Sequence, residues 1–493
     1  TLIPRAAVLF ICAAMLAGCS QKPSGQTSEL RFGVSSALAS LDPYGAAATA
    51  DGRSMLFSVF EGLVKPDTDG NLLPACASAF RAEDGGKVYV FTMRENLKFH
   101  GGADVTALDA KYSVETAKAA GFENFEKIEA VSASGGTLTI TLNAPDMDFL
   151  PNLTNAIIPE GSVGGDSPPP GTGPFSIEEF RPDQYLMLKK NPDYWQSGLP
   201  RLDRVTFVFQ PDSAAARLAL QGGGIDGAEV DYSVARAFEG SEDFSVYPIT
   251  SDAVQLLALN NNYEPLADAR VRRALCHAVN KGEIIDTVFY GHGVPSGSPV
   301  PPGFTKYFND TLTNAYDTDT EKAKALLAEA GFPNGFDLEI TVPSNYKMHV
   351  DTAQLLVNQL GAAGIRAAIK QVDWGTWLSD VYQGRNYQAT VISLDGSVLS
   401  PEVYLARWAS YSGSNFANYQ SAEYDEVYSS ALAEADGEKR KELFMRAQEI
   451  LSNDAASVFI QDISGFRVMR RGYDGVLDYP LYVFDAASVS YTQ

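Results

Sequence analysis

Cysteine and histidine are both scarce in this chain, whose 493 residues include four of each. Four cysteines are too few for a scaffold held together by disulfides, and no two histidines have the spacing of a metal-ligand motif. Basic residues are in the minority, since 38 Lys and Arg stand against 61 Asp and Glu and the formal net charge is −23. A surface this acidic repels phosphate groups. A protein cage for a metal and a nucleic-acid partner are therefore both unexpected.

Long hydrophobic runs are also missing, apart from residues 6–18, which follow Arg5 and are shorter than the roughly 20 residues that span a bilayer. A basic start, a short apolar stretch and small residues at its end are typical of an export signal. The stretch closes as Leu16-Ala17-Gly18-Cys19, which resembles the lipobox of bacterial lipoproteins. The resemblance implies a signal peptide over residues 1–18, lipid attachment at Cys19 and a polar tether over residues 19–29. A plain secretory signal with a chance cysteine is the alternative.

Cys76 and Cys276 remain once the signal is removed and Cys19 is lipidated, and each stands beside alanine in an apolar stretch. Both are expected to be small buried hydrophobic residues. A disulfide between them stays open as a possibility, because an exported protein meets an oxidising compartment. Their separation in sequence gives that pairing no local support.

Short strand-like and helix-like stretches alternate along the chain, which is typical of an α/β protein. Polar and apolar residues alternate with a period of two over residues 87–93 and 138–142, which predicts strands. Residues 318–321 have the spacing of a capping box headed by Thr318, and apolar residues at helical spacing continue to Gly331. A second helix is expected over about residues 438–452. Gly, Ser and Pro make residues 161–173 the clearest linker.

Several segments resemble, in order, landmarks of the family 5 extracellular solute-binding proteins, which serve peptide, opine and nickel importers. The most recognisable are Leu41-Asp42-Pro43, Gly171-Thr172-Gly173-Pro174-Phe175, Asn191-Pro192-Asp193-Tyr194-Trp195 and Val271-Arg272-Arg273-Ala274-Leu275, together with residues 59–64, 91–100, 278–281 and 326–332. These matches extend over roughly residues 30–465. One of them would be weak evidence, whereas so many in the right order are strong evidence.

The resemblance implies an α/β, two-lobed periplasmic-binding-protein-like fold with an extra inserted domain and a ligand cleft between the lobes. By analogy, residues 30–54, 172–258 and 467–493 form a discontinuous first lobe, residues 55–171 the inserted domain and residues 259–466 the second lobe. The function implied is that of a substrate-binding lipoprotein of an ABC transporter. It captures short peptides by hinge closure and delivers them to a membrane permease and its ATPases, as a monomer, without a cofactor and without catalysis.

Candidate ligand contacts are carried over residue by residue. In Asp373-Trp374-Gly375-Thr376-Trp377, Trp374 matches a position where an aromatic ring lines the cleft, and Trp377 is a second aromatic candidate. Peptide-binding members pair an aspartate with the α-ammonium of the ligand, but Ser397 stands at that position here. Asp395 lies two residues earlier on a predicted strand, on the same face, and is the expected substitute.

Four further residues are weaker candidates. Lys347 lies where some peptide-binding members have an arginine, and would bind the far carboxylate of the ligand or another anion. Thr49 follows the Leu-Asp-Pro landmark and would offer backbone groups from the first lobe. Asn418 and Tyr419 would help to close the cleft from the second lobe.

Three alternative functions remain at this point. A receptor for nickel held by a small chelator, or for another small solute, would not need the missing aspartate. An exported hydrolase is the alternative from another class of protein. His100-Gly101-Gly102 is similar to an esterase oxyanion loop, but no Gly-x-Ser-x-Gly motif accompanies it. A receptor that senses its ligand without importing it would have the same cleft.

Overall fold

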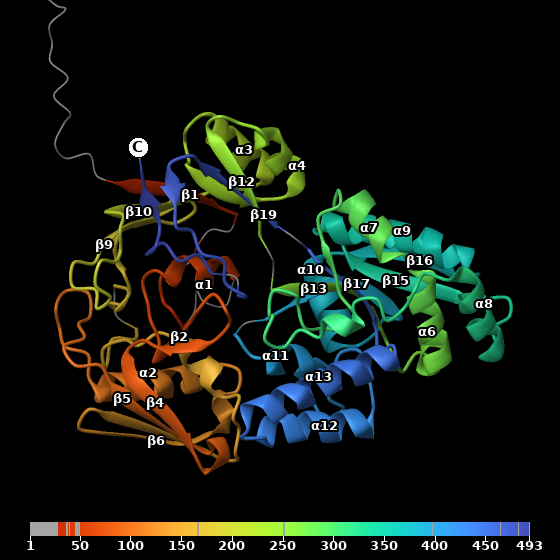
Figure 1. Ribbon diagram of the computed structural model, residues 1–493, viewed down its shortest axis with the longest axis horizontal. Coiled ribbons are helices and arrows are strands. Elements are labelled where there is room, and N and C mark those ends of the chain that lie inside the picture. The colour runs from red at the N-terminus through yellow and green to blue at the C-terminus, as the bar shows by residue number, and fades with distance from the viewer. Residues whose placement is uncertain are drawn as a thin grey trace, which may run out of the picture.

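The computed structural model describes residues 28–35, 38, 40–44, 50–164, 167–249, 252–396, 398–463, 465–481 and 483–492. The predictions on Cys19, Thr49 and Ser397 therefore lie outside the described residues. Two lobes, each built on its own sheet, and a third domain attached to the first lobe make up the molecule (Figure 1). This arrangement confirms the two-lobed α/β architecture expected from the sequence.

The first lobe is built on a seven-stranded sheet with the order β12-β19-β11-β1-β10-β9-β8. The strands are β1 (Glu29–Val34), β8 (Phe175–Arg181), β9 (Tyr185–Lys190), β10 (Arg204–Phe209), β11 (Gly227–Val230), β12 (Phe244–Ile249) and β19 (Gly465–Arg470). One face packs against α1 (Ala50–Leu56) and the C-terminal segment that carries Phe484. The other packs against α3 (Ser213–Gln221) and α4 (Tyr232–Ala235). Near the C-terminus, β20 (Tyr473–Asp474) pairs with β21 (Ser490–Tyr491).

The inserted domain has its own antiparallel sheet, in the order β4-β5-β7-β6, and a separate pair of short strands, β2 and β3. The elements are β2 (Val64–Pro66), β3 (Leu72–Pro74), β4 (Ala77–Glu83), β5 (Val88–Met93), α2 (Ala107–Ala119), β6 (Ile128–Ser134) and β7 (Thr137–Leu142). Alternate residues of β7 are buried, as its period-two pattern predicts. Thr106 caps α2 through a full capping box with Asp109, and α2 covers the sheet.

The second lobe is built on a six-stranded sheet with the order β14-β18-β13-β17-β15-β16. Its strands are β13 (Ala253–Leu259), β14 (Val294–Pro295), β15 (Asp337–Pro343), β16 (Arg366–Val372), β17 (Ala389–Asp395) and β18 (Val458–Asp462). The core on one face includes α6 (Ala269–Ala278), α7 (Lys281–Val288), α8 (Thr320–Glu329) and α9 (Lys347–Ala362), with α5 (Glu264–Ala267) beside them. The core on the other includes α11 (Glu402–Leu405), α12 (Ala422–Ala433) and α13 (Gly437–Asn453), and α10 (Trp374–Thr376) follows β16.

The lobe boundaries differ from those expected by analogy. The chain passes between the two sheets from β12 to β13 and returns from β18 to β19. The expected boundary at 258/259 therefore cuts the end of β13, and the one at 466/467 falls inside β19. The reason is that hydrogen bonding assigns each strand to a lobe: β13 pairs with β17 and β18, and β19 pairs with β11 and β12.

The glycines of the Gly-Thr-Gly landmark lie where the inserted domain joins the first lobe. A Cβ at Gly171 would stand 2.1 Å from the carbonyl oxygen of Val59, and a Cβ at Gly173 would stand 2.6 Å from the carbonyl carbon of the same residue. Main-chain hydrogen bonds tie this crossing together, including Gly173 N–H to the Val59 oxygen at 2.9 Å. The landmark is thus explained by close packing of two backbones.

Two local predictions are settled by the structure. Helix α8 forms where expected, but its cap is Asp319, which accepts from the Lys322 amide at 2.9 Å, and not Thr318. The Thr318 hydroxyl instead donates to the Val279 carbonyl at 3.3 Å. Cys76 and Cys276 are buried and free, in the cores of two different domains. Within the described residues, no helix is long and apolar enough to cross a membrane.

Candidate ligand cleft between the lobes

One edge of the second-lobe sheet, meaning here a side formed by strand ends and not by an outermost strand, faces the first lobe. Strand β15 is parallel to both β16 and β17, so all three strands end at the same edge. Antiparallel pairing places the start of β13 and the end of β18 at that edge too, as the register Val254↔Asp462 shows. These two strand ends lead to β12 and β19 of the first lobe, so this edge forms one wall of the cleft between the lobes.

Trp374 is the exposed end of an aromatic stack at this edge. Its ring is parallel to that of Trp377 at a centroid distance of 5.1 Å and meets the Tyr346 ring edge-on at 5.5 Å. Trp377 is buried, and its indole N–H donates to the Thr390 hydroxyl at 3.0 Å. Trp374 remains 37 % exposed. The buried tryptophan therefore holds the exposed ring in place, and only Trp374 of this pair can offer a surface to a ligand.

Asp395 is the last residue of β17 and its side chain is exposed. Its carbonyl oxygen accepts from the Arg407 guanidinium at 2.9 Å, and its backbone pairs with Ala253. The side chain lies on the same face of the sheet as that of Ser393, since the two residues are two positions apart. Asp395 thus lies at the cleft edge of the sheet, with its carboxylate in contact with solvent.

The structure separates the remaining predicted contacts. Lys347 is the first residue of α9, and its side chain is 84 % exposed and paired with Asp351 one turn later. Asn418 lies at the opposite edge of the sheet, where its amide donates to Asn260 beyond the end of β13 at 2.9 Å. Tyr419 is buried and donates to Asp454 at 2.8 Å. The positions of Asn418 and Tyr419 do not agree with a role in closing the cleft, because the sheet lies between them and the first lobe.

A cavity of about 460 Å³ lies where the first lobe, the inserted domain and the second lobe meet. Its lining is mostly apolar and includes Tyr44, Leu56, Phe57, Phe60, Phe122, Phe125, Val398, Leu481 and Val483. Val398 comes from the second lobe and follows the position of Ser397 directly. Tyr44 and Leu56, the lining residues on either side of Thr49 in the chain, come from the first lobe. The Leu-Asp-Pro landmark pointed to part of this site, but nothing in the sequence singled out residues 481–485.

Two carboxylates in this cavity have different surroundings. Glu61 is buried and accepts from Tyr194 at 2.6 Å, from Trp195 at 2.7 Å and from Lys65 at 3.4 Å. Asp485 is half-buried. Within the described chain it accepts hydrogen bonds only from neutral groups, the Tyr479 hydroxyl at 2.8 Å and the Ala487 amide at 2.9 Å. Burial, together with the Asp485 charge, raises the pKa of Tyr479, which stays protonated as a donor.

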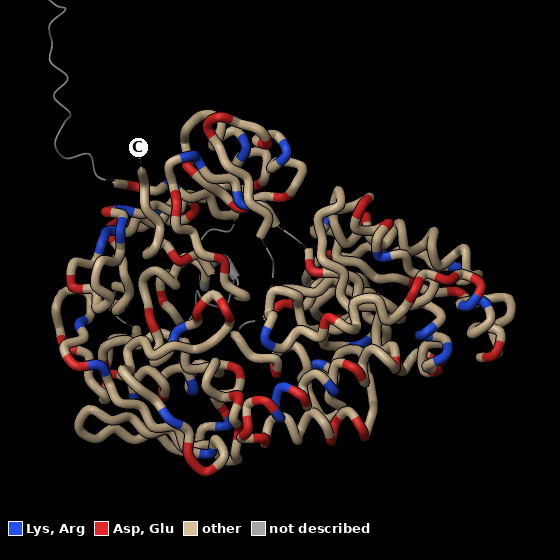
Figure 2. Tube along the Cα trace, viewed as in Figure 1, with Lys and Arg blue, Asp and Glu red and all other residues tan. Residues whose placement is uncertain are grey.

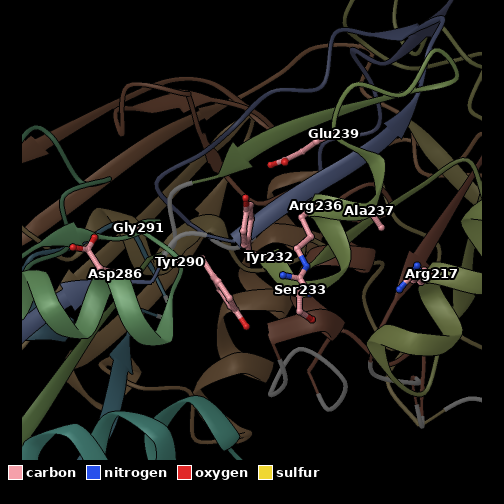
Figure 3. Close-up of a pocket in the computed structure, with 9 residues that line it drawn as sticks. All are labelled: Arg217, Tyr232, Ser233, Arg236, Ala237, Glu239, Asp286, Tyr290 and Gly291. Atoms are coloured by element: carbon pink, nitrogen blue, oxygen red, sulfur yellow. The ribbon is translucent and has the colours of Figure 1, made fainter.

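A second, open cavity of about 800 Å³ lies between the lobes on the side of α4 and α7. Figure 3 shows Asp286, Tyr290 and Gly291 on the second-lobe side, facing Tyr232 and Arg236 of the first lobe. The Tyr232 and Tyr290 rings are 5.3 Å apart, and the Arg236 guanidinium lies 5.8 Å from the centre of the Tyr290 ring. These contacts join the two lobes directly, between the half-buried Tyr232 or the exposed Arg236 and the exposed Tyr290.

The second lobe also touches the inserted domain through a buried ionic cluster, in a region where Figure 2 shows charges of both signs beside α13. The ammonium of Lys127 lies 2.9 Å from Asp146 and 2.7 Å from Glu402, and both carboxylates are nearly inaccessible to solvent. The Ser400 hydroxyl of the second lobe donates to Asp148 of the inserted domain. Burial, and then the nearby Glu402 charge, raise the pKa of Asp148 to about 7. We name this set of five residues the interdomain ionic cluster.

The histidines give no support to a metal site. His349 is buried at the first turn of α9, where its ring Nδ1 lies 3.0 Å from the Gln255 amide, and burial lowers its pKa to about 4. The His100 ring is hydrogen-bonded to the Gly173 carbonyl, and the His292 ring packs between Tyr232 and Phe466. Among the described residues, no group of three His, Cys, Asp or Glu side chains could hold a metal ion.

Two α/β lobes joined by two connecting segments, with a cavity where they meet the inserted domain, define a two-lobed solute-binding protein of the kind that serves membrane importers. The model of the bacterial extracellular solute-binding proteins, family 5, matches residues 71–416. This chain therefore belongs to that family of exported receptors, whose members bind solutes for ABC importers and work with permease and ATPase subunits.

The comparisons extend along nearly the whole chain. The glutathione-binding protein GsiB of Escherichia coli (strain K12) is 26 % identical over 498 residues, covering 94 % of this chain and 95 % of its own. The substrate-binding protein CtaP of Listeria monocytogenes superimposes with a TM-score of 0.84 at 24 % identity, over 95 % of this chain and 100 % of its own. The structure of AppA from Clostridium difficile, described as a putative peptide-binding protein, superimposes with a TM-score of 0.82 at 22 % identity, over 94 % of this chain and 100 % of its own. The two structures show a shared fold.

Proposed function

We propose that this protein captures a short peptide in the cavity between its lobes and delivers it to an ABC importer. The observation that carries the proposal is the cavity of about 460 Å³, to which all three domains contribute and which is lined mainly by aromatic and aliphatic side chains. A concave, largely apolar site with few polar groups suits a small organic ligand, whose polar ends those groups orient. The GsiB relatives, named for glutathione, a small peptide, support this ligand class.

Closure of the lobes is part of the proposal. Val398 comes from the second lobe and the other lining residues from the first lobe, the inserted domain and the C-terminal segment, so separating the lobes would open the cavity. Trp374 stands at the cleft edge of the second-lobe sheet, where it would meet a ligand that extends beyond the cavity. Hinge motion about the two interlobe crossings would admit and release the ligand.

We also propose that the protein is anchored to the membrane through lipid on Cys19. The lipobox-like sequence supports this proposal, and residues 20–28 would serve as a polar tether. Mass spectrometry of the N-terminal peptide from the membrane fraction would test it. An acylated Cys19 is expected, and release of the Cys19→Ala variant into the soluble fraction would agree. An unmodified Cys19 in the mature protein would contradict it.

Native mass spectrometry would test the main proposal. The soluble form, beginning after Cys19, would be purified without denaturation and sprayed under conditions that preserve complexes. A ladder of added masses that match short peptides is expected. A single added mass that contains nickel, or turnover of ester, peptide or glycan substrates, would contradict the peptide receptor.

A further inference from the structure

We propose that Asp485 binds the ammonium group of the solute, in place of the aspartate that is missing at position 397. This inference rests on the proposed function and specifies it: the solute has a free amine, and its apolar part occupies the remainder of the cavity. Asp485 belongs to the C-terminal segment of the first lobe, far in sequence from the second-lobe position where the resemblance placed this role.

The charges in the cavity lining support Asp485. Four charged side chains line the cavity among the described residues: Glu61, Lys65, Glu123 and Asp485. Glu61 and Lys65 compensate each other, and the Lys65 ammonium also donates to Gln196 at 2.8 Å. Glu123 is exposed and therefore hydrated. Asp485 is the half-buried carboxylate of this set for which the described chain supplies no cation.

The hydrogen bonds of Asp485 leave room for a ligand. Among the described residues, each of its two oxygens accepts one hydrogen bond, Oδ2 from Tyr479 and Oδ1 from the Ala487 amide. A carboxylate has about four acceptor positions, so about two remain for an ammonium group. Tyr479 in turn packs against Phe57 of the cavity wall, with ring centres 5.8 Å apart. The carboxylate is thus held in a fixed orientation before any ligand arrives.

The physical gain from an amine is large at this position. A carboxylate among aromatic and aliphatic groups loses hydration, and a cation restores the balance of charge. The attraction between the two charges is stronger there than in water, because the surroundings screen less. Hydrogen bonds between an ammonium and a carboxylate are roughly twice as strong as those between neutral groups. Asp395, by contrast, is exposed at a strand end and lines neither cavity, so solvent weakens any pair that it forms.

The test uses two pools of the same synthetic tripeptides, one with free amino termini and one N-acetylated, competing for the protein in native mass spectrometry. The wild-type protein is expected to retain peptides from the free-amine pool alone. Asp485→Asn should weaken that binding by about 30-fold, the lower end of the scale for removing one partner of a charge pair that the bound solute itself covers. Asp395→Asn is the competing variant and should change binding by less than about 3-fold, as for an exposed pair.

Tyr479→Phe is the matched control. It removes the hydrogen bond from the Tyr479 hydroxyl to Asp485 and leaves the carboxylate in place, so it separates a local structural disturbance from the loss of charge. It should retain most of the binding. Equal retention of both pools by the wild-type protein, a result that needs no variant, would overturn the inference. Full binding by Asp485→Asn would do the same and leave the peptide proposal intact. Failure of the wild-type protein to bind either pool would overturn the proposed function and this inference together.

Discussion

Replacing Lys127 by methionine should loosen the contact between the inserted domain and the second lobe. Methionine keeps much of the aliphatic length of lysine and removes the charge. Asp146 and Glu402 would then lose the ammonium that now lies 2.9 Å and 2.7 Å away. Both carboxylates would remain buried, with Asp148 beside them. Removing one partner of a buried ion pair costs about 3–5 kcal/mol, and we expect a loss in that range for the domain contact.

The amide of Met147 is a direct reporter of this contact. It belongs to the inserted domain and donates to the Leu432 carbonyl of the second lobe at 3.3 Å. Its hydrogen exchange therefore measures the free energy of opening the interface, without the assumption that the whole chain unfolds in one step. A loss of 3 kcal/mol corresponds to exchange that is faster by about 150-fold. The effect should be largest at pH 8, because at lower pH the carboxylates can relieve their repulsion by taking up protons.

Lys98→Met is the matched control. Lys98 pairs with Asp104, but the side chains are 36 % and 72 % exposed, so the pair should contribute less than about 1 kcal/mol. Exchange at Met147 should not change in this variant. If Lys127→Met raised the exchange of Met147 by less than about 5-fold, the interdomain ionic cluster could not be a significant source of stability for this interface.

Three further predictions concern pH, backbone packing and the exposed tryptophan. The pKa of Asp148 is raised to about 7, so the folded protein holds a proton that the unfolded chain releases near pH 4. The free energy of unfolding should therefore fall as pH rises from 4 to 7, and Asp148→Asn should flatten this dependence in thermal unfolding. Gly171→Ala should destabilise the protein by about 2 kcal/mol or more, because its Cβ would stand 2.1 Å from the Val59 oxygen. The control is Gly136→Ala, whose Cβ would have no neighbour within 4 Å and which should shift the melting temperature little. Equal shifts in the two variants would refute the packing argument. Trp374→Ala should weaken peptide binding by about 10-fold and leave stability nearly unchanged, which titration calorimetry and melting curves would check. Unchanged affinity would mean that the ligand does not extend from the cavity to the Trp374 ring.

Strand and helix positions could be predicted well from local patterns. The period-two stretch over residues 138–142 lies in β7, and the helix expected over residues 438–452 lies in α13, because side-chain alternation and helical spacing are properties of neighbouring residues. The capping-box spacing predicts the cap of α8 one residue too early, because Thr318 and Asp319 both have side chains that can cap a helix. Only the partner of Thr318, the Val279 carbonyl, distinguishes the two.

Candidate ligand contacts were harder to predict than the elements that carry them. Trp374 could be placed at the cleft because it matches a family position where an aromatic ring lines the cleft. Tyr419 has an equally suitable side chain for binding, but it lies in the core at the far edge of the same sheet. A sequence pattern gives no information on which edge of a sheet faces the partner lobe, since strand order is set by pairing between distant segments.

The sequence by itself determined the family and the two-lobed α/β class, because the family landmarks, such as the Gly-Thr-Gly segment, occur in a fixed order along one chain. Only the tertiary structure decided which residues share the cavity. Phe57 lies hundreds of residues before both Val398 and Asp485 in the chain, yet the three residues line one cavity. Their proximity depends on the two strand crossings between the lobes and on the return of the C-terminal segment to the first lobe. No local pattern encodes these long-range contacts, which depend on burial and sheet pairing throughout the chain.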